Sequence, residues 1–232
     1  MKKLIIIPAY NESEAILSTV ETIRREAPDF DYLVVNDCST DSTKQILEEH
    51  RLNFLDLPVN LGIGGAVQTG YMYAYRHGYD MAVQVDGDGQ HDPAFLKTMA
   101  DHLENHHCDM VIGSRFIRKE GFQSSRARRM GIQWFSWLIR MMTGVTITDP
   151  TSGLRMVGRK GMELFSKDYP RDYPEPETIV TLLNRNLKIE EIPVIMRERQ
   201  GGTSSINLKK SVYYMVKVSL AILFERSRKN KC

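Results

Sequence analysis

Two carboxylates stand one residue apart in the segment Asp86–His91, directly after the apolar run 81–85. Glycines between them let the backbone turn, and aspartate–glycine pairs often do no more than form turns. Here, however, an amide and an imidazole side chain follow Asp86 and Asp88 in the same short loop. The carboxylate and amide oxygens are hard ligands, which suit Mg²⁺ or Mn²⁺ better than zinc. We therefore interpret the segment as a metal site that completes its coordination shell with water and a substrate phosphate.

Two more polar segments, Pro8–Glu12 and Asn36–Asp41, also follow apolar runs. Asp37, in the second of them, could accept hydrogen bonds from a nucleotide base or ribose. His91, in the acidic loop, is a candidate contact to phosphate or to a ligand of the metal. Because ligands in open parallel sheets bind at the carboxyl ends of the strands, we expect the three loops to converge on one edge.

The elements that would position these loops alternate between strand and helix. Apolar runs predict strands at 4–7, 32–35, 54–57, 81–85 and 110–112, with a later strand at 189–196. Helical spacing of apolar residues predicts helices over 16–23, 42–50, 66–75, 94–103 and 178–187. This alternation implies right-handed crossovers and a mainly parallel sheet flanked by helices, which is an α/β fold. The segment 148–155 is interpreted as a loop.

The composition is that of an ordinary globular protein. The chain has 232 residues and a formal net charge of +2, which excludes a protein that coats nucleic acid through bulk charge. Its three cysteines are far apart and lack metal-ligand spacing, so we expect no disulfide framework and a reducing cytosol. The apolar run 4–7 is too short for a secretory leader, and no segment offers the ~20 apolar residues of a spanning helix.

Six motifs occur in an order that resembles the family 2 glycosyltransferases of GT-A fold. The likeness is greatest to the branch of dolichyl-phosphate mannose synthase and bacterial polyprenyl-phosphate glycosyltransferases. The motifs are Pro8–Glu12, Asn36–Asp41, Asp86–His91, Gly113–Arg115, Asp149–Arg155 and Arg199–Ser205. The resemblance implies a Rossmann-like GT-A catalytic domain over residues 1–206 and a C-terminal amphipathic, basic helix over 207–232.

The resemblance also implies roles for individual residues. Asp86, Asp88 and Gln90 would hold Mg²⁺ or Mn²⁺, and Asp88 would be catalytic. The nucleotide-sugar donor would be bound by Pro8, Tyr10, Glu12, Asp37, Asp86 and Arg199. Two departures from the mannose synthase pattern are Ser205, where Lys is common, and Gln133, where Ser often stands. These departures favour UDP-linked glucose or N-acetylglucosamine over GDP-mannose as the donor.

The implied reaction is an inverting transfer of the sugar to a polyprenyl phosphate carrier, for cell-envelope polysaccharide or glycan synthesis. A phosphate monoester is already largely dianionic near neutral pH, so it needs cationic contacts rather than a base. Arg115 and Arg129 are the candidate catalytic cations, because one follows the fifth predicted strand and the other precedes an aromatic helix. Arg126 joins them as a candidate contact to the acceptor phosphate.

Three other functions remain open. Transfer to a sugar hydroxyl, on a lipid-linked or polysaccharide acceptor, requires a carboxylate base, for which Glu175, Glu177 and Asp149 are candidates. A nucleotidyltransferase would carry a glycine-rich, basic phosphate loop after the first strand, where this chain has Pro8–Glu12. A non-catalytic membrane adaptor would not need the acidic loop.

The basic stretch 115–129 leads into an apolar segment that contains Trp134, Phe135 and Trp137. Basic residues beside an aromatic face suit the membrane interface, and core packing is the alternative. The segment Ser211–Phe224 is a second candidate interfacial helix, or a helix that docks against a small integral membrane protein. We expect a peripheral protein on the cytoplasmic face of the cell membrane, with its C-terminal amphipathic helices at the surface and no nucleic-acid partner.

His102, His106 and His107 lie close together at helical spacing. Histidines four residues apart on a helix can bind zinc, as in the zinc metalloproteases. Without an evident acidic or cysteine partner for them, we interpret these histidines as an exposed helix end.

Overall fold

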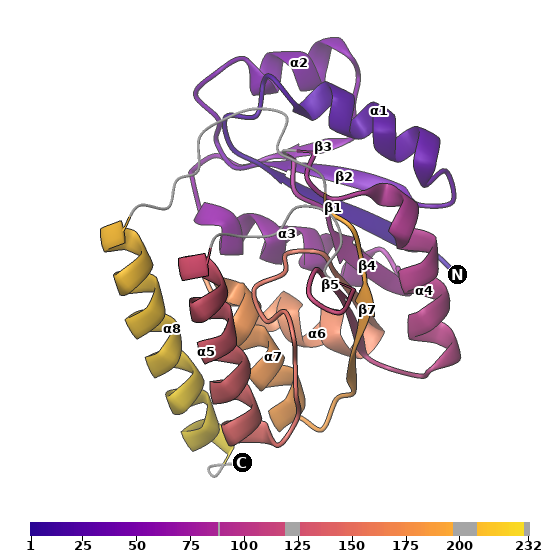
Figure 1. The fold of residues 1–232 in the computed structure, drawn as a ribbon. Helices are drawn as coiled ribbons and strands as arrows, with labels where there is room; N and C mark the ends of the chain where they lie inside the picture. Colours follow the sequence, from indigo (N-terminus) through magenta and orange to yellow (C-terminus); the bar gives the residue numbers. More distant parts are fainter. Residues whose placement is uncertain (88, 119–125, 197–207, 230–232) are drawn as a thin grey trace.

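The computed structural model describes residues 1–87, 89–118, 126–196 and 208–229. A seven-stranded sheet in the order β3-β2-β1-β4-β6-β5-β7 lies at its centre (Figure 1). The strands are β1 (Lys3–Ala9), β2 (Asp31–Asn36), β3 (Phe54–Asp56), β4 (Met81–Gln84), β5 (Met110–Ser114), β6 (Arg155–Gly158) and β7 (Ile189–Pro193). The prediction of an α/β fold with a mainly parallel sheet is confirmed.

One strand runs against the others. Strands β1 to β4 are mutually parallel and β7 is parallel to β5, whereas β6 is antiparallel to both β4 and β5. Strand β6 was not predicted from the sequence, because its four residues begin with an arginine and carry no alternating pattern. Its reversed direction brings the preceding loop, residues 149–154, to the edge where the parallel strands end.

Helices cover both faces of the sheet (Figure 1). They are α1 (Ile16–Glu26), α2 (Thr43–Glu49), α3 (Gly62–Arg76), α4 (Leu96–Asn105), α5 (Arg126–Thr143), α6 (Arg159–Lys167), α7 (Pro174–Asn184) and α8 (Leu208–Lys229), with a short 3₁₀ turn η1 (Pro93–Phe95) before α4. Helices α1, α2 and α4 pack on one face, and α3 and α5 to α8 pack on the other. The chain therefore has three layers, with the sheet in the middle.

Strand β1 shows why this arrangement gives a continuous apolar run in the sequence. Leu4 and Ile6 join the core cluster beneath α3, while Ile5 and Ile7 join the cluster beneath α1. All four side chains are fully buried. Because successive side chains of a strand point to opposite faces, only a strand covered on both faces has this pattern.

Helices α5 and α8 lie side by side at one end of the molecule (Figure 1). The indole nitrogen of Trp134 on α5 donates a hydrogen bond of 3.0 Å to the hydroxyl of Ser219 on α8. Val218 and Ile222 of α8 are buried in the core, so this helix is packed against the sheet-bearing part of the chain. In the described part of the chain, we find no helix whose length and apolar character would let it span a bilayer.

Candidate active site

The carboxyl ends of the parallel strands bring three predicted loops to one edge. Strand β1 leads into Pro8–Glu12, β2 into Asn36–Asp41 and β4 into the acidic loop that starts at Asp86. Strand β5 ends there at Ser114, next to Arg115, and the loop before antiparallel β6 reaches the same edge. The convergence expected from the sequence is confirmed.

The first two loops hold each other through their polar side chains. The amide of Asn11 donates to the hydroxyl of Ser39 at 3.0 Å, and the amide of Thr40 donates to the side-chain oxygen of Asn11 at 2.8 Å. The amide of Glu12 donates to the Thr43 hydroxyl at 2.9 Å. These bonds fix the loop backbone while leaving the side chain of the neighbouring Tyr10 48% exposed.

Asp37 is buried between these loops and the start of α3. Its carboxylate oxygen Oδ1 accepts the amide hydrogen of Leu61 at 2.7 Å, and its carbonyl accepts from the Asn60 side chain at 3.1 Å. The structure thus places Asp37 at the predicted edge, where it also anchors the segment that leads into α3. Its contact with a nucleotide stays a prediction.

In the acidic loop, Asp86 is oriented by two neighbours. Its Oδ1 accepts from the side-chain amide of Gln84 at 3.0 Å, and its backbone amide donates to Nδ1 of the buried His91 at 2.9 Å. Because Nδ1 accepts a hydrogen bond, the proton of the neutral imidazole sits on Nε2, which lies 3.7 Å from Oδ2 of Asp86. His91 therefore helps to fix the position of Asp86.

Gly153 lies next to this carboxylate. A Cβ on Gly153 would lie 3.2 Å from Oδ2 of Asp86 and 3.4 Å from the ring of His91. Only a residue without a side chain leaves that oxygen accessible to a ligand in this position. The carboxylate of Asp86 keeps 36% of its side-chain surface exposed, which fits a group that binds a cation at the site's edge.

Arg115 is held by a buried carboxylate. Its Nε and one terminal nitrogen donate to the two oxygens of Asp149, both at 2.7 Å, and the same terminal nitrogen donates to Thr151 at 3.0 Å. Asp149 has no exposed surface. A bidentate pair of this kind fixes the plane of the guanidinium group. Asp149 therefore positions Arg115 and is badly placed to act as a base toward a hydroxyl.

Asp149 is itself anchored by a residue that the sequence analysis missed. The two oxygens of Glu191 accept the backbone amides of Thr148 and Asp149, at 2.6 and 2.8 Å. Burial raises the pKa of Glu191, although these two amides act in the opposite direction. The sequence carries no local signal for this role, because the partners of Glu191 lie more than 40 residues away.

Arg155, at the start of β6, is buried and ties two loops together. Its guanidinium donates to the carbonyls of Ser152 and Pro150, at 2.6 and 2.7 Å. It also donates to the carbonyl of Glu175 and to the Thr178 hydroxyl, at the start of α7. This residue fixes the loop that presents Asp149 and Gly153 to the site.

Glu175 lies next to this arginine, at the start of α7. Desolvation raises the pKa of its carboxyl group, and the positive charge of Arg155 opposes the rise. A carboxyl group with a raised pKa is a better proton acceptor near neutral pH than an ordinary one. Glu175 therefore stays a candidate base for the hydroxyl-acceptor alternative.

The remaining predicted residues lie elsewhere or outside the described range. Arg129 is exposed in the first turns of α5, and Arg126 is the first residue of that helix. Asp88 and Arg199 lie outside the described residues, as does Ser205. Gln90, in the acidic loop, and Glu12, in the loop that follows β1, are both partly buried.

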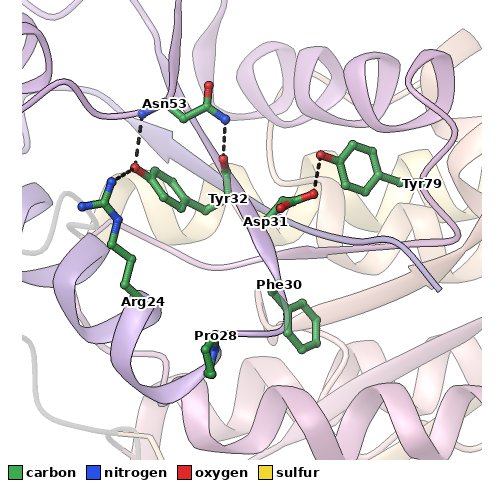
Figure 2. A pocket seen from close by; sticks show the side chains of 7 residues that line it. All are labelled: Arg24, Pro28, Phe30, Asp31, Tyr32, Asn53 and Tyr79. Atoms are coloured by element: carbon green, nitrogen blue, oxygen red, sulfur yellow. Dashed lines mark hydrogen bonds between the residues drawn. The ribbon is translucent and has the colours of Figure 1, made fainter.

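A separate hollow of about 440 Å³ opens at the other edge, where β2 begins (Figure 2). Arg24 and the backbone amide of Asn53 donate to the Tyr32 hydroxyl at 2.6 and 3.2 Å. The Tyr79 hydroxyl donates to Asp31 at 2.9 Å. Its polar groups bond to one another rather than converging on the centre, so we place the active site at the opposite edge.

Comparison with known proteins identifies the family of this chain. Residues 4–163 match the profile of glycosyl transferase family 2. An undecaprenyl-phosphate mannosyltransferase of Micrococcus luteus is 30% identical over 216 residues, which cover 89% of this chain and 88% of that protein. A UDP-N-acetylglucosamine–dolichyl-phosphate N-acetylglucosaminyltransferase of Methanococcus voltae is 28% identical, over 82% of this chain and 83% of that protein.

Solved structures show the same fold. Glucosyl-3-phosphoglycerate synthase from Mycobacterium tuberculosis, in complex with phosphoglyceric acid, gives a TM-score of 0.75 at 18% identity, over 97% of this chain and 80% of that one. A complex of that enzyme with Mn²⁺, UDP-glucose and phosphoglyceric acid gives a TM-score of 0.74 at 17% identity, with the same coverage. The predicted GT-A fold is confirmed, and the profile match shows that the chain belongs to glycosyl transferase family 2.

Proposed function

We propose that this protein transfers a sugar from a nucleotide-sugar donor to a polyprenyl phosphate, with inversion at the sugar carbon. The observation that carries the proposal is the bidentate ion pair between Arg115 and Asp149 at this edge of the sheet. It holds the guanidinium group in a fixed orientation, in which it can contact an incoming anion. Relatives whose names specify undecaprenyl phosphate and dolichyl phosphate as acceptors support the same acceptor class.

The residues of the acidic loop fit a divalent cation. Asp86 presents a partly exposed carboxylate whose direction is set by Gln84 and His91, and Gly153 leaves space in front of it. With Asp88 and Gln90, it would form an oxygen-rich site for Mg²⁺ or Mn²⁺. The bound ion would neutralise the charge that grows on the departing nucleoside diphosphate. The structural relative that carries Mn²⁺ with UDP-glucose supports this assignment.

The loops that follow β1 and β2 would bind the nucleoside. The exposed ring of Tyr10 stands on a backbone held by hydrogen bonds, and an aromatic ring on a rigid loop can stack on a base at little entropic cost. Buried Asp37 lies at the same edge. For the sugar, the departures at Gln133 and Ser205 favour UDP-linked glucose or N-acetylglucosamine, while relatives act on mannose and on N-acetylglucosamine.

The chemistry needs no base in this account. An oxygen of the acceptor phosphate attacks the anomeric carbon, and the bond from that carbon to the diphosphate oxygen breaks on the opposite face. The acceptor phosphate is already ionised near pH 7, so no proton has to leave during attack. Arg115 would orient the phosphate and reduce the repulsion between the two anionic substrates. Arg129 and Arg126, at the start of α5, are the further contacts we assign to the lipid phosphate.

A second candidate function is transfer to a sugar hydroxyl. The raised pKa of Glu175, caused chiefly by desolvation, is the observation that favours it. Such a transfer would depend on this carboxylate as a proton acceptor, whereas transfer to a phosphate would not. The two functions therefore differ in their response to Glu175→Gln, which keeps the size of the side chain.

The outer faces of α5 and α8 suit a peripheral position on the membrane. Exposed apolar side chains recur at helical spacing on both helices: Met130, Trp134, Trp137 and Met141 on α5, and Tyr213, Val216, Leu220, Leu223 and Phe224 on α8. The two helices lie side by side (Figure 1), and Trp134 bonds to Ser219 between them, so we infer that these rows belong to one apolar surface. We propose that this surface meets the cytoplasmic face of the membrane, where the lipid acceptor is found. A small integral membrane protein is the alternative occupant.

The test supplies purified polyprenyl phosphate, Mg²⁺ or Mn²⁺ and a panel of UDP- and GDP-linked sugars. The expected product is a lipid-phosphate sugar that mild acid hydrolyses, formed together with the nucleoside diphosphate. Arg115→Gln should raise the apparent KM for the lipid, while donor binding measured by calorimetry survives. Sugar appearing only on hydroxyl acceptors, with loss of activity in Glu175→Gln and not in Arg115→Gln, would establish the second function instead.

A further inference from the structure

A second cluster of titratable side chains lies at the opposite edge of the sheet from the candidate active site. His102 lies in the last turn of α4, and His106 caps that helix. Glu190 is the second residue of β7 and pairs in register with Val111 of β5. The parallel neighbours β5 and β7 both begin at this edge, so the cluster is separated from the acidic loop by the length of the sheet.

The three side chains converge on a single point. Oxygen Oε2 of Glu190 lies 2.6 Å from Nε2 of His102 and 3.0 Å from Nδ1 of His106. The two imidazole rings are stacked, with centroids 3.9 Å apart and planes inclined by 19°. Within the described parts of the chain, this is the one group of three His, Cys, Asp or Glu residues whose potential ligand atoms all lie within 4.8 Å of one another.

We propose that His102, His106 and Glu190 form a binding site for a divalent transition-metal ion, with Zn²⁺ as the best match. Two imidazole nitrogens and one carboxylate oxygen are a ligand set that zinc accepts, with a water molecule as the fourth ligand. Ligand atoms of a tetrahedral zinc ion stand roughly 3.3 Å apart, given bonds of about 2.0–2.1 Å, so small side-chain rotations suffice. The site differs chemically from the oxygen-rich loop at Asp86, which suits Mg²⁺ or Mn²⁺.

The surroundings leave the ligand atoms reachable. The ammonium group of Lys188 lies 2.7 Å from the other oxygen of Glu190, Oε1, while Oε2 faces the two histidines. The side chain of His106 is 51% exposed, so an ion can enter and a water molecule can complete its shell.

An ion at this site would join two elements that also build the candidate active site. Helix α4 follows the acidic loop by way of η1, and β7 leads to Met196, which forms a β-bridge with His91. The ion would tie the far ends of these elements together. Because the three ligands meet only in the folded chain, binding should stabilise the fold.

The experiment titrates the full chain with Zn²⁺, and in parallel with Co²⁺, whose absorption reports tetrahedral nitrogen and oxygen ligands. An Asp86→Asn background removes a ligand assigned to the other metal, so that zinc bound there does not enter the count. In that background we expect one bound ion, and a melting temperature that rises by roughly 5–10 °C at free zinc 100 times the Kd. The His102→Gln/His106→Gln double variant should lose the ion, the Co²⁺ absorption and the thermal shift.

Two further variants sharpen the result. His107→Gln is the matched control, because His107 is adjacent and exposed but lies outside the cluster, and it should bind zinc as the parent does. Lys188→Gln should strengthen binding, because it removes a positive charge beside the carboxylate. Equal zinc stoichiometry and affinity in the parent and the double variant would overturn the proposal, and so would equal losses in the double variant and His107→Gln.

Discussion

Replacing Asp149 by Asn tests how the site holds its acceptor-facing cation. The substitution keeps the size of the side chain and one oxygen that can accept a hydrogen bond, but it removes the negative charge. Arg115 would lose its charged partner while remaining only 12% exposed. The variant therefore leaves a nearly buried guanidinium group with a neutral partner.

The expected loss of stability follows from this geometry. Removing one partner of a buried ion pair costs about 3–5 kcal/mol. The lower end applies here, because Arg115 keeps some exposure and its hydrogen bond to Thr151. We expect Asp149→Asn to lower the free energy of unfolding by about 3 kcal/mol, which for a chain of this size lowers the melting temperature by about 6–12 °C.

The assay combines urea unfolding with transfer kinetics. In the folded variant, a guanidinium group that is no longer fixed should raise the apparent KM for the lipid phosphate by at least about tenfold, or ~1.4 kcal/mol. Asp101→Asn is the control, because it breaks the exposed ion pair with Lys97 and should leave both stability and kinetics nearly unchanged. A loss below about 1 kcal/mol together with an unchanged KM would show that Asp149 does not position Arg115.

Three further outcomes are expected. Burial raises the pKa of Glu175 above its usual 4.5, so the folded state binds this proton more tightly than the unfolded state, and stability is lost as pH rises through the folded pKa. In urea unfolding, the free energy of unfolding of Glu175→Gln should therefore exceed that of wild type by an amount that grows from about pH 4.5 upward and is absent below it. Burial raises the pKa of the Cys108 thiol to about 11, so at pH 8 iodoacetamide should modify Cys38, which is partly exposed, well before Cys108, as peptide mass spectrometry would show. Trp134→Ala/Trp137→Ala should weaken sedimentation with anionic vesicles in both low and high salt, whereas equal sedimentation of the two proteins would assign the tryptophans no part in membrane binding.

Strands β1, β2, β4 and β5 could be predicted from the sequence, because most of their residues are buried and a polar loop follows each of them. Strand β1 is the simplest example, since four consecutive fully buried residues leave no other interpretation than an inner strand. The positions of Asp37, Asp86 and Arg115 at one edge followed from strand order alone. Local pattern and parallel topology were sufficient for this part of the site.

The second half was harder because its determinants are not local. Strand β6 begins with Arg155, a residue type that usually lies at the surface. Arg155 is buried because carbonyl groups of the preceding loop and of the first turn of α7 accept its hydrogen bonds. The hydrogen bond from the amide of Asp149 to Glu191 could not be predicted, because the two residues are 42 positions apart and only the folded sheet brings them together. Likewise, the histidines at the end of α4 looked unpartnered until β7 brought Glu190 beside them, so the prediction of an exposed helix end was wrong for His102.

We propose that the acceptor is a phosphate, whose attack needs a cation and no base. The most direct measurement compares kcat/KM for polyprenyl phosphate with that for the matching polyprenol, in wild type, Arg115→Gln and Glu175→Gln, with the best donor and saturating Mg²⁺ or Mn²⁺. We expect transfer to the phosphate alone, a large loss of this transfer in Arg115→Gln, and near-normal activity in Glu175→Gln. Comparable transfer to the alcohol, abolished by Glu175→Gln and insensitive to Arg115→Gln, would contradict the proposal.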